Sequence, residues 1–488
     1  MPALAVILLL PTTSSAWRVI PRGAKQAGPI AIDARRDIFA AISLRPSRYD
    51  IATAIVKLAH ADGAELWRRP LRARGDERSD EIHDLEVVGN GDLVAAGSLD
   101  DNGHTTFFVV RISGADGRVR WRRLIRGRRP STVGTEESAS AIAVDAAGNV
   151  VAVGSIEGPT KSQFGYANDF AVVKFDGRTG EERWRFMLNG TADDYDFATS
   201  VGVDRTGDVI AIGLVRDGLP LYAREVRVAV KLARDDGRLL WRRDEVGLTV
   251  SDVVIDGRGD AVIASASNPF APGSFDAIKL AGTTGDPLWV SVLSRGPDDL
   301  SYVSQLRVLS SGDVVAVGGS STYAAANGSW IVARLDGETG AARWSQVLKG
   351  SADNGWGSAL AIASDGDIVV GGTVVNARSC YDAAVARLDA TEGDVLHLRS
   401  IDGTATASEC ERPECGASRI PCGPTRKGID QDRLNALAID AKGRIAIAGV
   451  VCNGSRGREH GFVARLPGPP TAPSASPPAP RSSSASRP

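Results

Sequence analysis

Two kinds of hydrophobic segment alternate along the chain. The first is a pair of short apolar runs joined by a polar turn, as in AIAVDAAGNVVAVGS from Ala141 to Ser155. The second is an apolar run, a polar turn and a further run that closes on tryptophan, as in DFAVVKFDGRTGEERW from Asp169 to Trp184. The runs of the first kind contain almost no polar residue, which is typical of strands buried on both faces. Each segment therefore predicts a β-hairpin.

The two hairpins recur in alternation along the chain. Copies of the first begin at Ile30, Leu85, Ala141, Val201, Val253, Leu306, Leu360 and Leu437. Copies of the second end at Trp67, Trp121, Trp184, Trp241, Trp289 and Trp344, and His397 takes the tryptophan position in one more. These end positions are 48 to 63 residues apart, a period typical of propeller blades or solenoid turns. Four strands per unit, packed between neighbouring sheets, predict an all-β fold, a β-propeller of four-stranded antiparallel blades.

The eighth unit lacks its outermost strand. Its last apolar run is GFVARLPG, from Gly461 to Gly468, and a stretch rich in Pro and Ser follows. At the other end of the chain, AWRVIPRG from Ala16 to Gly23 matches the last-strand pattern of RWSQVLKG from Arg343 to Gly350. A strand shared between the two ends would remove free sheet edges. We therefore predict an eight-bladed propeller over residues 17–468 whose last blade is closed by the N-terminal strand.

The two ends of the chain differ in composition from the repeats. An apolar run from Ala3 to Leu10 precedes Ser14, Ser15 and Ala16, which fits a signal peptide although a basic leading segment is missing. The run is too short to span a membrane. We expect residues 1–16 to be a signal peptide and the protein to be secreted or periplasmic. Residues 469–488, which are rich in Pro and Ser, predict a disordered tail.

The tryptophan-closed hairpins resemble the tryptophan-docking repeats of the pyrroloquinoline-quinone-like (PQQ-like) propellers. In those repeats a D-x-x-T-G-x-x-x-W segment packs each blade against the next. Asp176 to Trp184 and Asp336 to Trp344 match the pattern in full, and Thr284, Gly285 and Trp289 match part of it. The first hairpin, together with DFAVVKFD, is also similar to the SBBP type of bacterial propeller repeat. The resemblance implies the fold, because the matching residues are structural ones.

The same resemblance raises an enzymatic alternative. Eight-bladed quinoproteins are alcohol or glucose dehydrogenases that hold the quinone and a calcium ion on the propeller axis. This sequence has no Cys-Cys dipeptide, which many alcohol-oxidising members carry, and no recognisable cluster of Glu, Asn and Asp for the calcium. It also lacks a nucleophile elbow, a phosphate loop and a zinc-protease motif. We therefore expect a protein that is not an enzyme and needs no cofactor, with a PQQ- or metal-dependent oxidoreductase as the alternative.

The connections between hairpins vary far more than the turns inside them. The long or irregular ones are Ser155 to Asn168, Leu214 to Arg224, Ser320 to Ser329 and Thr404 to Arg433. Alternating strand direction places them all on one side of the ring, which we call the variable face. Loops on a rigid scaffold commonly carry function. A net charge of −2 argues against a nucleic-acid partner, so we expect a monomeric scaffold that binds a protein, peptide or glycan there.

Residues just before the innermost strands are predicted to ring the mouth of the central channel on the variable face. Ten residues before the hairpin glycine stand Phe197, Tyr302 and Trp356, and eleven before it stand Asp80, Glu137, Asp196 and Asp432. Aromatic planes beside carboxylates suit a sugar, a cation or a peptide. The alternative is that the aromatic rings fill gaps between blades and the acids are turn residues. Small polar residues, together with His83, occupy the next positions of the inner strands near the channel mouth. They predict a channel filled with water.

Two residue clusters bear on metals and on the cellular compartment. Asp193, Asp194 and Asp196 bunch carboxylates that calcium could use, although their spacing is not that of a known calcium loop. The five cysteines, which map to one face of two neighbouring blades, are Cys380, Cys410, Cys415, Cys422 and Cys452. Disulfides with one cysteine left over are the favoured interpretation and suit an exported protein. Zinc is the alternative, but the spacing is not a standard one for zinc.

Overall fold

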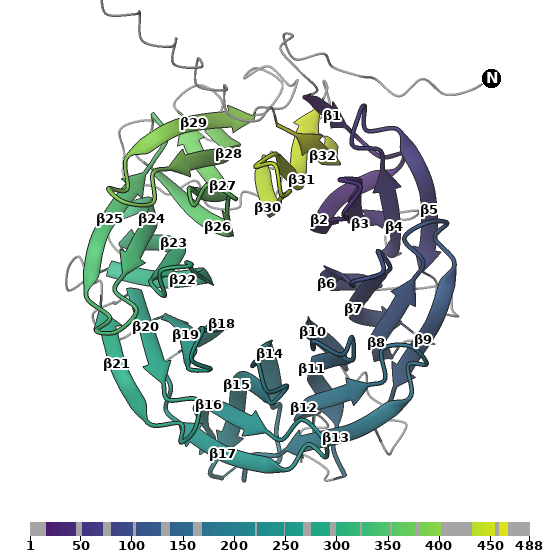
Figure 1. Cartoon of the computed structure of the whole chain (residues 1–488), viewed down its shortest axis with the longest axis vertical. Helices are drawn as coiled ribbons and strands as arrows, with labels where there is room; N and C mark the ends of the chain where they lie inside the picture. The colour runs from purple at the N-terminus through teal and green to yellow at the C-terminus, as the bar shows by residue number, and fades with distance from the viewer. Residues whose placement is uncertain are drawn as a thin grey trace, which may run out of the picture.

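The eight-bladed propeller predicted from the repeats is confirmed. The computed structural model describes residues 16–44, 51–71, 80–100, 104–127, 137–159, 168–219, 222–247, 249–266, 275–292, 299–322, 325–351, 354–376, 380–401, 432–453 and 458–466. Over these residues, 32 strands form eight four-stranded antiparallel blades around a central channel (Figure 1). One backbone pair, Ala266 with Tyr302, additionally links the fifth and sixth blades.

Each blade takes four strands, ordered from the channel outward. Blade 1 contains β2 (Ala24–Ile32), β3 (Ile38–Leu44), β4 (Ala52–Leu58) and β5 (Glu65–Leu71). Blade 2 contains β6 (Glu81–Val87), β7 (Leu93–Asp100), β8 (Thr105–Ile112) and β9 (Val119–Ile125). Blade 3 contains β10 (Ser138–Val144), β11 (Val150–Glu157), β12 (Asn168–Phe175) and β13 (Glu182–Leu188). Blade 4 contains β14 (Phe197–Val203), β15 (Val209–Asp217), β16 (Arg224–Leu232) and β17 (Leu239–Asp244).

The second half of the ring repeats this order. Blade 5 contains β18 (Thr249–Ile255), β19 (Ala261–Ala266), β20 (Phe275–Leu280) and β21 (Pro287–Val292). Blade 6 contains β22 (Asp299–Val308), β23 (Val314–Thr322), β24 (Ala325–Leu335) and β25 (Ala342–Leu348). Blade 7 contains β26 (Asn354–Ile362), β27 (Ile368–Asn376), β28 (Cys380–Leu388) and β29 (Val395–Ile401). Blade 8 contains β30 (Arg433–Ile439), β31 (Ile445–Asn453), β32 (Arg458–Arg465) and β1 (Trp17–Val19).

The N-terminal strand closes the last blade, as predicted. β1 runs antiparallel to β32, with Trp17 opposite Arg465. The ring is thus held shut by strand pairing between the two ends of the chain, and the last sheet gains a fourth strand at its open edge.

The core is a ring of layers between adjacent blades. Every residue of β7 and of β12 is buried, because each blade packs against a neighbour on both faces. One hydrophobic cluster joins Val94 and Phe107 of blade 2 to Val150 and Phe175 of blade 3. The outer strands are different, since β13 alternates between exposed and buried positions at its start. Burial on both faces of the middle strands explains their nearly unbroken apolar sequence.

A glycine in the left-handed region turns most of the hairpins. Gly148, between β10 and β11, has a φ of 80°, and Gly180, between β12 and β13, has a φ of 71°. In the first blade, Arg36 occupies the position of the hairpin glycine and adopts a φ of 74°. A residue with a Cβ is strained in the left-handed region of φ, whereas glycine adopts it without strain.

Each closing tryptophan packs on the next blade. The Trp121 indole N–H donates to the Gly177 carbonyl at 2.9 Å, and its ring lies against Gly180, where an added Cβ would come within 2.5 Å of the ring. Arg111, from the third strand, donates to the same carbonyl at 2.5 Å. The indoles that bond to the next blade in this way are those of Trp17, Trp67, Trp184, Trp241, Trp289 and Trp344. The repeated tryptophans are therefore joints between blades.

Candidate functional site

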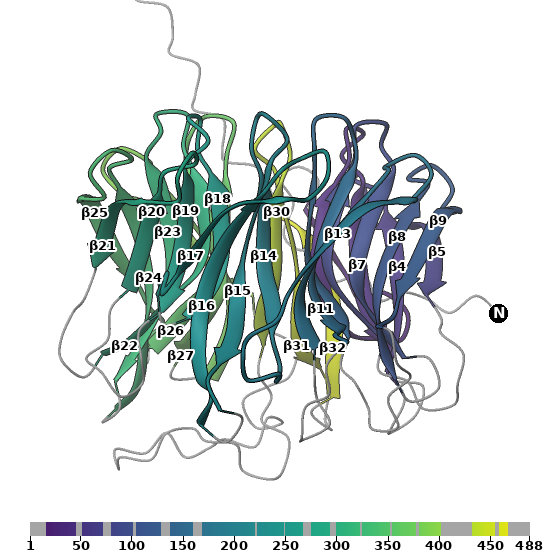
Figure 2. The same cartoon turned by 90° about the horizontal axis from the view of Figure 1, so that it is seen from below.

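The two ends of the ring differ in what they present. Figure 2 shows the hairpin turns gathered along its upper side, whereas β16 and β22 reach toward the lower side. That lower side is the variable face, where second strands end and third strands begin. The inner strands line the channel (Figure 1), so their first residues lie at its mouth on this face.

The four acids predicted at the channel mouth are almost entirely buried. They are Asp80, Glu137, Asp196 and Asp432. The Asp100 N–H donates to Asp80 Oδ1 at 3.0 Å. The Arg216 N–H donates likewise to Asp196 Oδ1 at 2.7 Å. Asp80 and Asp196 thus hold the end of a second strand against the start of the first strand. Contact of the four acids with a ligand stays a prediction.

Asp196 belongs to a group of acids at the boundary of blades 3 and 4. Burial raises the pKa of Asp196 to about 7, although hydrogen bonds from the Gly190 and Arg216 N–H groups act to lower it. The negative charge of Asp169 raises the pKa of Asp196 further. Burial, and then the nearby Asp193, raise the pKa of Asp169 to about 6. Ionising both carboxylates therefore costs the folded state stability near neutral pH.

The aspartates considered for calcium are engaged with protein groups. Asp194 pairs with Arg216 at 2.9 Å, and Asp193 accepts a hydrogen bond from the Asn189 amide at 2.7 Å. Both oxygens of Asp196 accept backbone N–H bonds. Among the described residues, no group of three or more His, Cys, Asp or Glu is placed to hold a metal ion. These three aspartates do not form a metal centre by themselves, and calcium binding stays a prediction.

Two of the predicted aromatic residues come together on neighbouring blades. Tyr302 in β22 is 38% exposed, and Trp356 in β26 lies 5.5 Å from the ring of Tyr381. A Cβ added at Gly319 would lie 3.0 Å from the Tyr302 hydroxyl and 3.2 Å from Trp356 Cβ. We call Tyr302, Trp356 and Tyr381 the aromatic cluster. Phe197 stands apart from it at the start of β14, and its ring lies 5.3 Å from that of the tyrosine two residues earlier.

The small polar residues of the inner strands connect neighbouring blades. Each of them sits at a β-bulge, and they are His83, Ser140, Thr199, Ser251, Ser304, Ser358 and Asn435. Ser304 Oγ donates to the Gly357 carbonyl at 2.8 Å, and Asn435 Nδ2 donates to the Ala27 carbonyl at 2.8 Å. His83, Ser251 and Ser358 reach the next blade in the same way. Thr199 Oγ1 instead donates to the Ile212 carbonyl of its own blade at 3.3 Å, and the wet channel stays a prediction.

The channel wall carries a few charged residues deeper in. Asp84 accepts a hydrogen bond from the Ile142 N–H at 2.9 Å. Burial raises the pKa of Asp84, and the negative charge of Asp252 raises it further. Since β6 and β18 lie in blades 2 and 5, this influence acts across the channel. Arg307 lies 3.6 Å from Asp252, and burial followed by Asp84 raises the pKa of Glu86 to about 7. Burial and the repulsion between neighbouring carboxylates thus both favour protonated carboxyl groups at Asp84 and Glu86.

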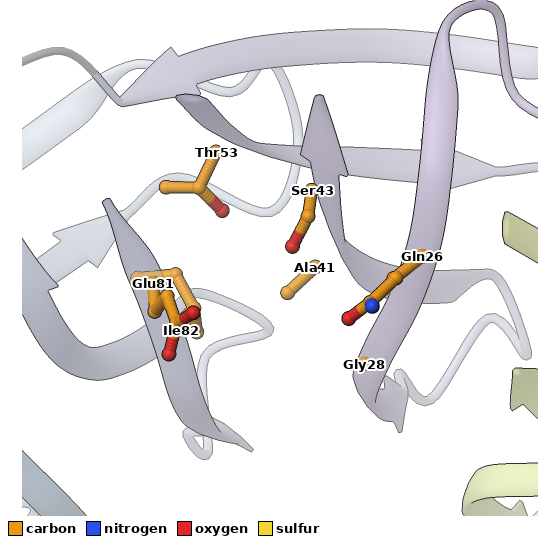
Figure 3. Close-up of a pocket in the computed structure, with 7 residues that line it drawn as sticks. All are labelled: Gln26, Gly28, Ala41, Ser43, Thr53, Glu81 and Ile82. Atoms are coloured by element: carbon orange, nitrogen blue, oxygen red, sulfur yellow. The ribbon is translucent and has the colours of Figure 1, made fainter. Parts of the chain in front are cut away.

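A pocket of about 120 Å³ opens on the variable face between blades 1 and 2. Its lining residues, drawn in Figure 3, are Gln26, Gly28, Ala41, Ser43, Thr53, Glu81 and Ile82. In β2, Gly28 and Pro29 stand opposite the single residue Ala41, so the strand bulges away from β3. The bulge leaves the space that forms the pocket.

The first blade carries Ile42 where most other blades carry glycine. Six other blades have glycine at that position, and they are Gly97, Gly154, Gly213, Gly318, Gly372 and Gly449. A Cβ at Gly97 would lie 2.0 Å from the Glu81 carbonyl oxygen of the paired inner strand. Ile42 therefore places a side chain where the paired inner strand comes closest in the glycine blades. The pocket was not predicted from the sequence, in which Gly28-Pro29 between apolar residues is the one signal of an irregular strand.

Polar groups from two blades converge on the pocket (Figure 3). Thr53 Oγ1 donates to the Ile42 carbonyl at 3.3 Å, which leaves its lone pairs to accept. His83 Nε2 lies 3.3 Å from Glu81 Oε2. This contact outweighs burial and holds the pKa of Glu81 below its usual range. Burial lowers the pKa of His83, but Glu81 and the Ala139 carbonyl raise it by more.

A second pocket, of about 260 Å³, lies at the hairpin turns on the opposite face. It is lined by Asp33, Ala34, Arg35, Lys57, Gly89, Asn90, Gly91, Gly114 and Ala115. The Lys57 ammonium donates to Asp33 at 2.7 Å and to the Gly114 carbonyl of the next blade at 2.8 Å. Equivalent ion pairs recur around the ring, as at Lys231 with Asp204. The charges of this pocket belong to a blade joint.

Several predictions fall wholly or partly outside the described residues. Cys380 begins β28 and Cys452 lies near the end of β31, both at the variable face. Cys410, Cys415 and Cys422 lie outside the described residues, as do the predicted signal peptide up to residue 15 and the predicted tail. Disulfide pairing, cleavage and a disordered tail therefore stay predictions.

The ring of repeated blades and its tryptophan joints define a propeller of PQQ-like repeats. The family model described as "Outer membrane protein assembly factor BamB" matches residues 168–411, half of the chain. The chain belongs to this family. A search of curated protein sequences finds no match.

Solved propellers share the fold at low sequence identity. Sqt1 of Chaetomium thermophilum, solved bound to the N-terminus of the ribosomal protein L10, is 12% identical with a TM-score of 0.55, over 91% of this chain and 97% of that one. The Dos1 propeller is 10% identical with a TM-score of 0.51, over 92% and 94%. BamB of Moraxella catarrhalis is 13% identical with a TM-score of 0.46, over 94% and 100%. At these identities the first two show the fold alone.

Proposed function

We propose that this protein is an exported, monomeric, non-enzymatic scaffold that binds a protein or peptide on its variable face, at the mouth of the channel. One observation carries the proposal. The pocket between blades 1 and 2 gathers polar side chains that are not part of the bonding repeated around the ring. The aromatic cluster lies on the same face and adds a half-exposed ring at Tyr302.

The scaffold part of the proposal is supported by the joints. Indole, ammonium and guanidinium groups from one blade bond to the next, so the variable face is presented on a stiff ring. A rigid surface loses little entropy when it binds. The tryptophan contacts also support assigning the repeats to the tryptophan-docking and SBBP types. Sqt1 offers a parallel, since that propeller was solved with the N-terminus of another protein bound.

The export part of the proposal rests on other grounds. The description of the family, an outer-membrane assembly factor, supports a place in the periplasm or at the outer membrane. The predicted signal peptide and disulfides belong to the same proposal. In the part of the chain that the structure describes, no helix is both long and apolar enough to cross a membrane.

The test is a selection of displayed peptides on the full chain, followed by affinity measurement. Selected peptides should bind the wild type and lose at least tenfold in affinity for Tyr302→Ala or Glu81→Gln. Arg258→Ala, an exposed residue in a hairpin turn on the opposite face, serves as the matched control and should bind normally. Peptides whose affinity is unchanged by every substitution on the variable face would overturn the proposal.

A second arm of the experiment addresses the oxidoreductase alternative. Thermal melting of the full chain is compared with and without calcium plus pyrroloquinoline quinone, and dye reduction is assayed with alcohols and glucose. A quinone-dependent rise in Tm together with dye reduction would replace the scaffold proposal by the enzymatic one.

A further inference from the structure

We propose that the pocket between blades 1 and 2 binds a primary ammonium group of the partner, supplied by a lysine side chain or a free amino terminus. This inference rests on the proposed function and names the chemistry that the variable face recognises. It follows from the size of the pocket, the charge of its lining and the donors and acceptors that the lining offers.

The size limits what can enter. Pockets for whole small molecules measure roughly 300–1,000 Å³, whereas this one measures about 120 Å³. It can therefore take only a terminal group of a larger ligand. Ile82 and Ala41, which are 7% and 4% exposed, give the pocket an apolar part that suits the methylene next to a charged head.

The charge of the lining selects a cation. Glu81 is the one charged residue among the seven that line the pocket, and none of the seven is basic. The Glu81 side chain is 51% exposed, and its contact with His83 uses Oε2 and holds the pKa of the carboxyl below its usual range. Oε1 is left to face a ligand. An anion would be repelled here, and a neutral group would gain only about half of what a charge-assisted hydrogen bond provides.

The hydrogen-bonding groups match an ammonium better than a guanidinium or a hydroxyl. An ammonium carries three donors and no acceptor. The Thr53 hydroxyl donates its hydrogen to the Ile42 carbonyl, so Oγ1 can only accept a hydrogen bond from a group in the pocket. Glu81 and the side-chain oxygens of Gln26 and Ser43 supply further acceptors around the same space (Figure 3). A planar guanidinium is larger and needs a flat, bidentate partner.

The probe is n-butylammonium, titrated into the full chain labelled with ¹³C at isoleucine methyl groups. The Ile82 methyl reports on the pocket because this residue lines it. We expect a saturable shift of this signal, absent with neutral n-butanol at the same concentrations. Glu81→Gln keeps the shape but removes the charge, and it should weaken binding about tenfold or more.

The matched control is Glu459→Gln. Glu459 lies near the start of β32 on the same face, 3.9 Å from Arg433, and its loss removes the same net charge. This variant should bind n-butylammonium like the wild type. Equal responses to n-butanol and n-butylammonium, or equal affinities of Glu81→Gln and wild type, would overturn the inference. Melting curves that match the wild type show that the variants remain folded.

Two peptides then separate the sources of the ammonium. One has a blocked amino terminus and a single lysine, and the other has a free amino terminus and no lysine. The one that binds more tightly identifies the natural source. A selected peptide that is lost in Tyr302→Ala but binds Glu81→Gln as tightly as the wild type would overturn the ammonium inference and leave the proposed function standing.

Discussion

Replacing Gly180 by alanine should weaken the joint between blades 2 and 3 far more than replacing Gly148 in the same blade. Both glycines sit in tight turns with similar left-handed φ angles, 71° and 80°. An alanine at either position must adopt that conformation, which costs about 1 kcal/mol or slightly more. Any larger difference between the two variants must therefore come from what surrounds the new Cβ.

The surroundings of the two glycines differ sharply. No atom lies within 4 Å of a Cβ built at Gly148, whereas at Gly180 it would lie 2.5 Å from Trp121 Cδ2. Trp121 is 5% exposed and is fixed by its bond to the Gly177 carbonyl at 2.9 Å, so it cannot move away without loss. Forcing one extra carbon into a packed site costs about 1–3 kcal/mol. We expect a loss of about 1 kcal/mol for Gly148→Ala and about 2–4 kcal/mol for Gly180→Ala.

The assay is urea unfolding of the full chain, followed by tryptophan fluorescence and compared at the urea midpoint. A lower midpoint with an unchanged slope reports a change in stability alone. The Gly180→Ala midpoint should fall clearly below that of Gly148→Ala. Equal midpoints for the two variants would refute the idea that the tryptophan joints hold neighbouring blades together.

Three further predictions concern other parts of the ring. Arg36→Gly should raise the free energy of unfolding by up to about 1 kcal/mol in the same urea assay, because Arg36 has a strained φ of 74° that glycine adopts freely. The gain is limited because glycine loses more backbone entropy on folding than arginine does. A lower urea midpoint would contradict this prediction. Burial raises the pKa of Glu86 from its usual 4.5 to about 7. The stability from the protonated form is thus full below pH 4.5 and lost as the pH rises through 7, and Glu86→Gln should flatten this decline in melting temperature measured across that range. Trp17→Ala should cost about 3–5 kcal/mol, since Trp17 is 5% exposed and bonds to the His60 carbonyl; hydrogen exchange should show β32 opening first, and unchanged protection there would argue against closure by β1.

The fold could be predicted almost completely from the sequence. Nearly unbroken apolar runs, turn glycines and closing tryptophans are local signals, and each fixes one hairpin. Repetition then fixes the number of blades, and the missing strand at Gly461 to Gly468 requires a partner from the other end. The individual hydrogen bonds that join one blade to the next could not be predicted from the sequence. The Lys231 ammonium, for example, bonds to the Gly282 carbonyl of the next blade, 51 residues later.

The candidate site was harder to predict, because side-chain direction at a bulge does not follow the strand period. Asp80 and Asp196 were placed correctly before inner strands, but their carboxylates turn to backbone N–H groups. The proximity of Tyr302 to Trp356 arises from two blades and a glycine between them, at Gly319. Such convergence depends on the packing of neighbouring blades, which a single sequence does not encode at any one position.

The pocket lies in a blade that departs from the repeat at several positions. Arg36 replaces the turn glycine, Ile42 replaces the glycine that faces an inner-strand carbonyl, and β2 pairs with β3 through two register shifts instead of one. Other blades depart from the repeat at other points, since His397 stands at the tryptophan position of blade 7 and β1 supplies the last strand of blade 8. Blade 1 stays joined to blade 2 through the Trp67 bond to the Gly114 carbonyl. The proposed ammonium site thus lies in a blade with several departures from the repeat, and the titration of Glu81→Gln tests whether this opening binds a ligand.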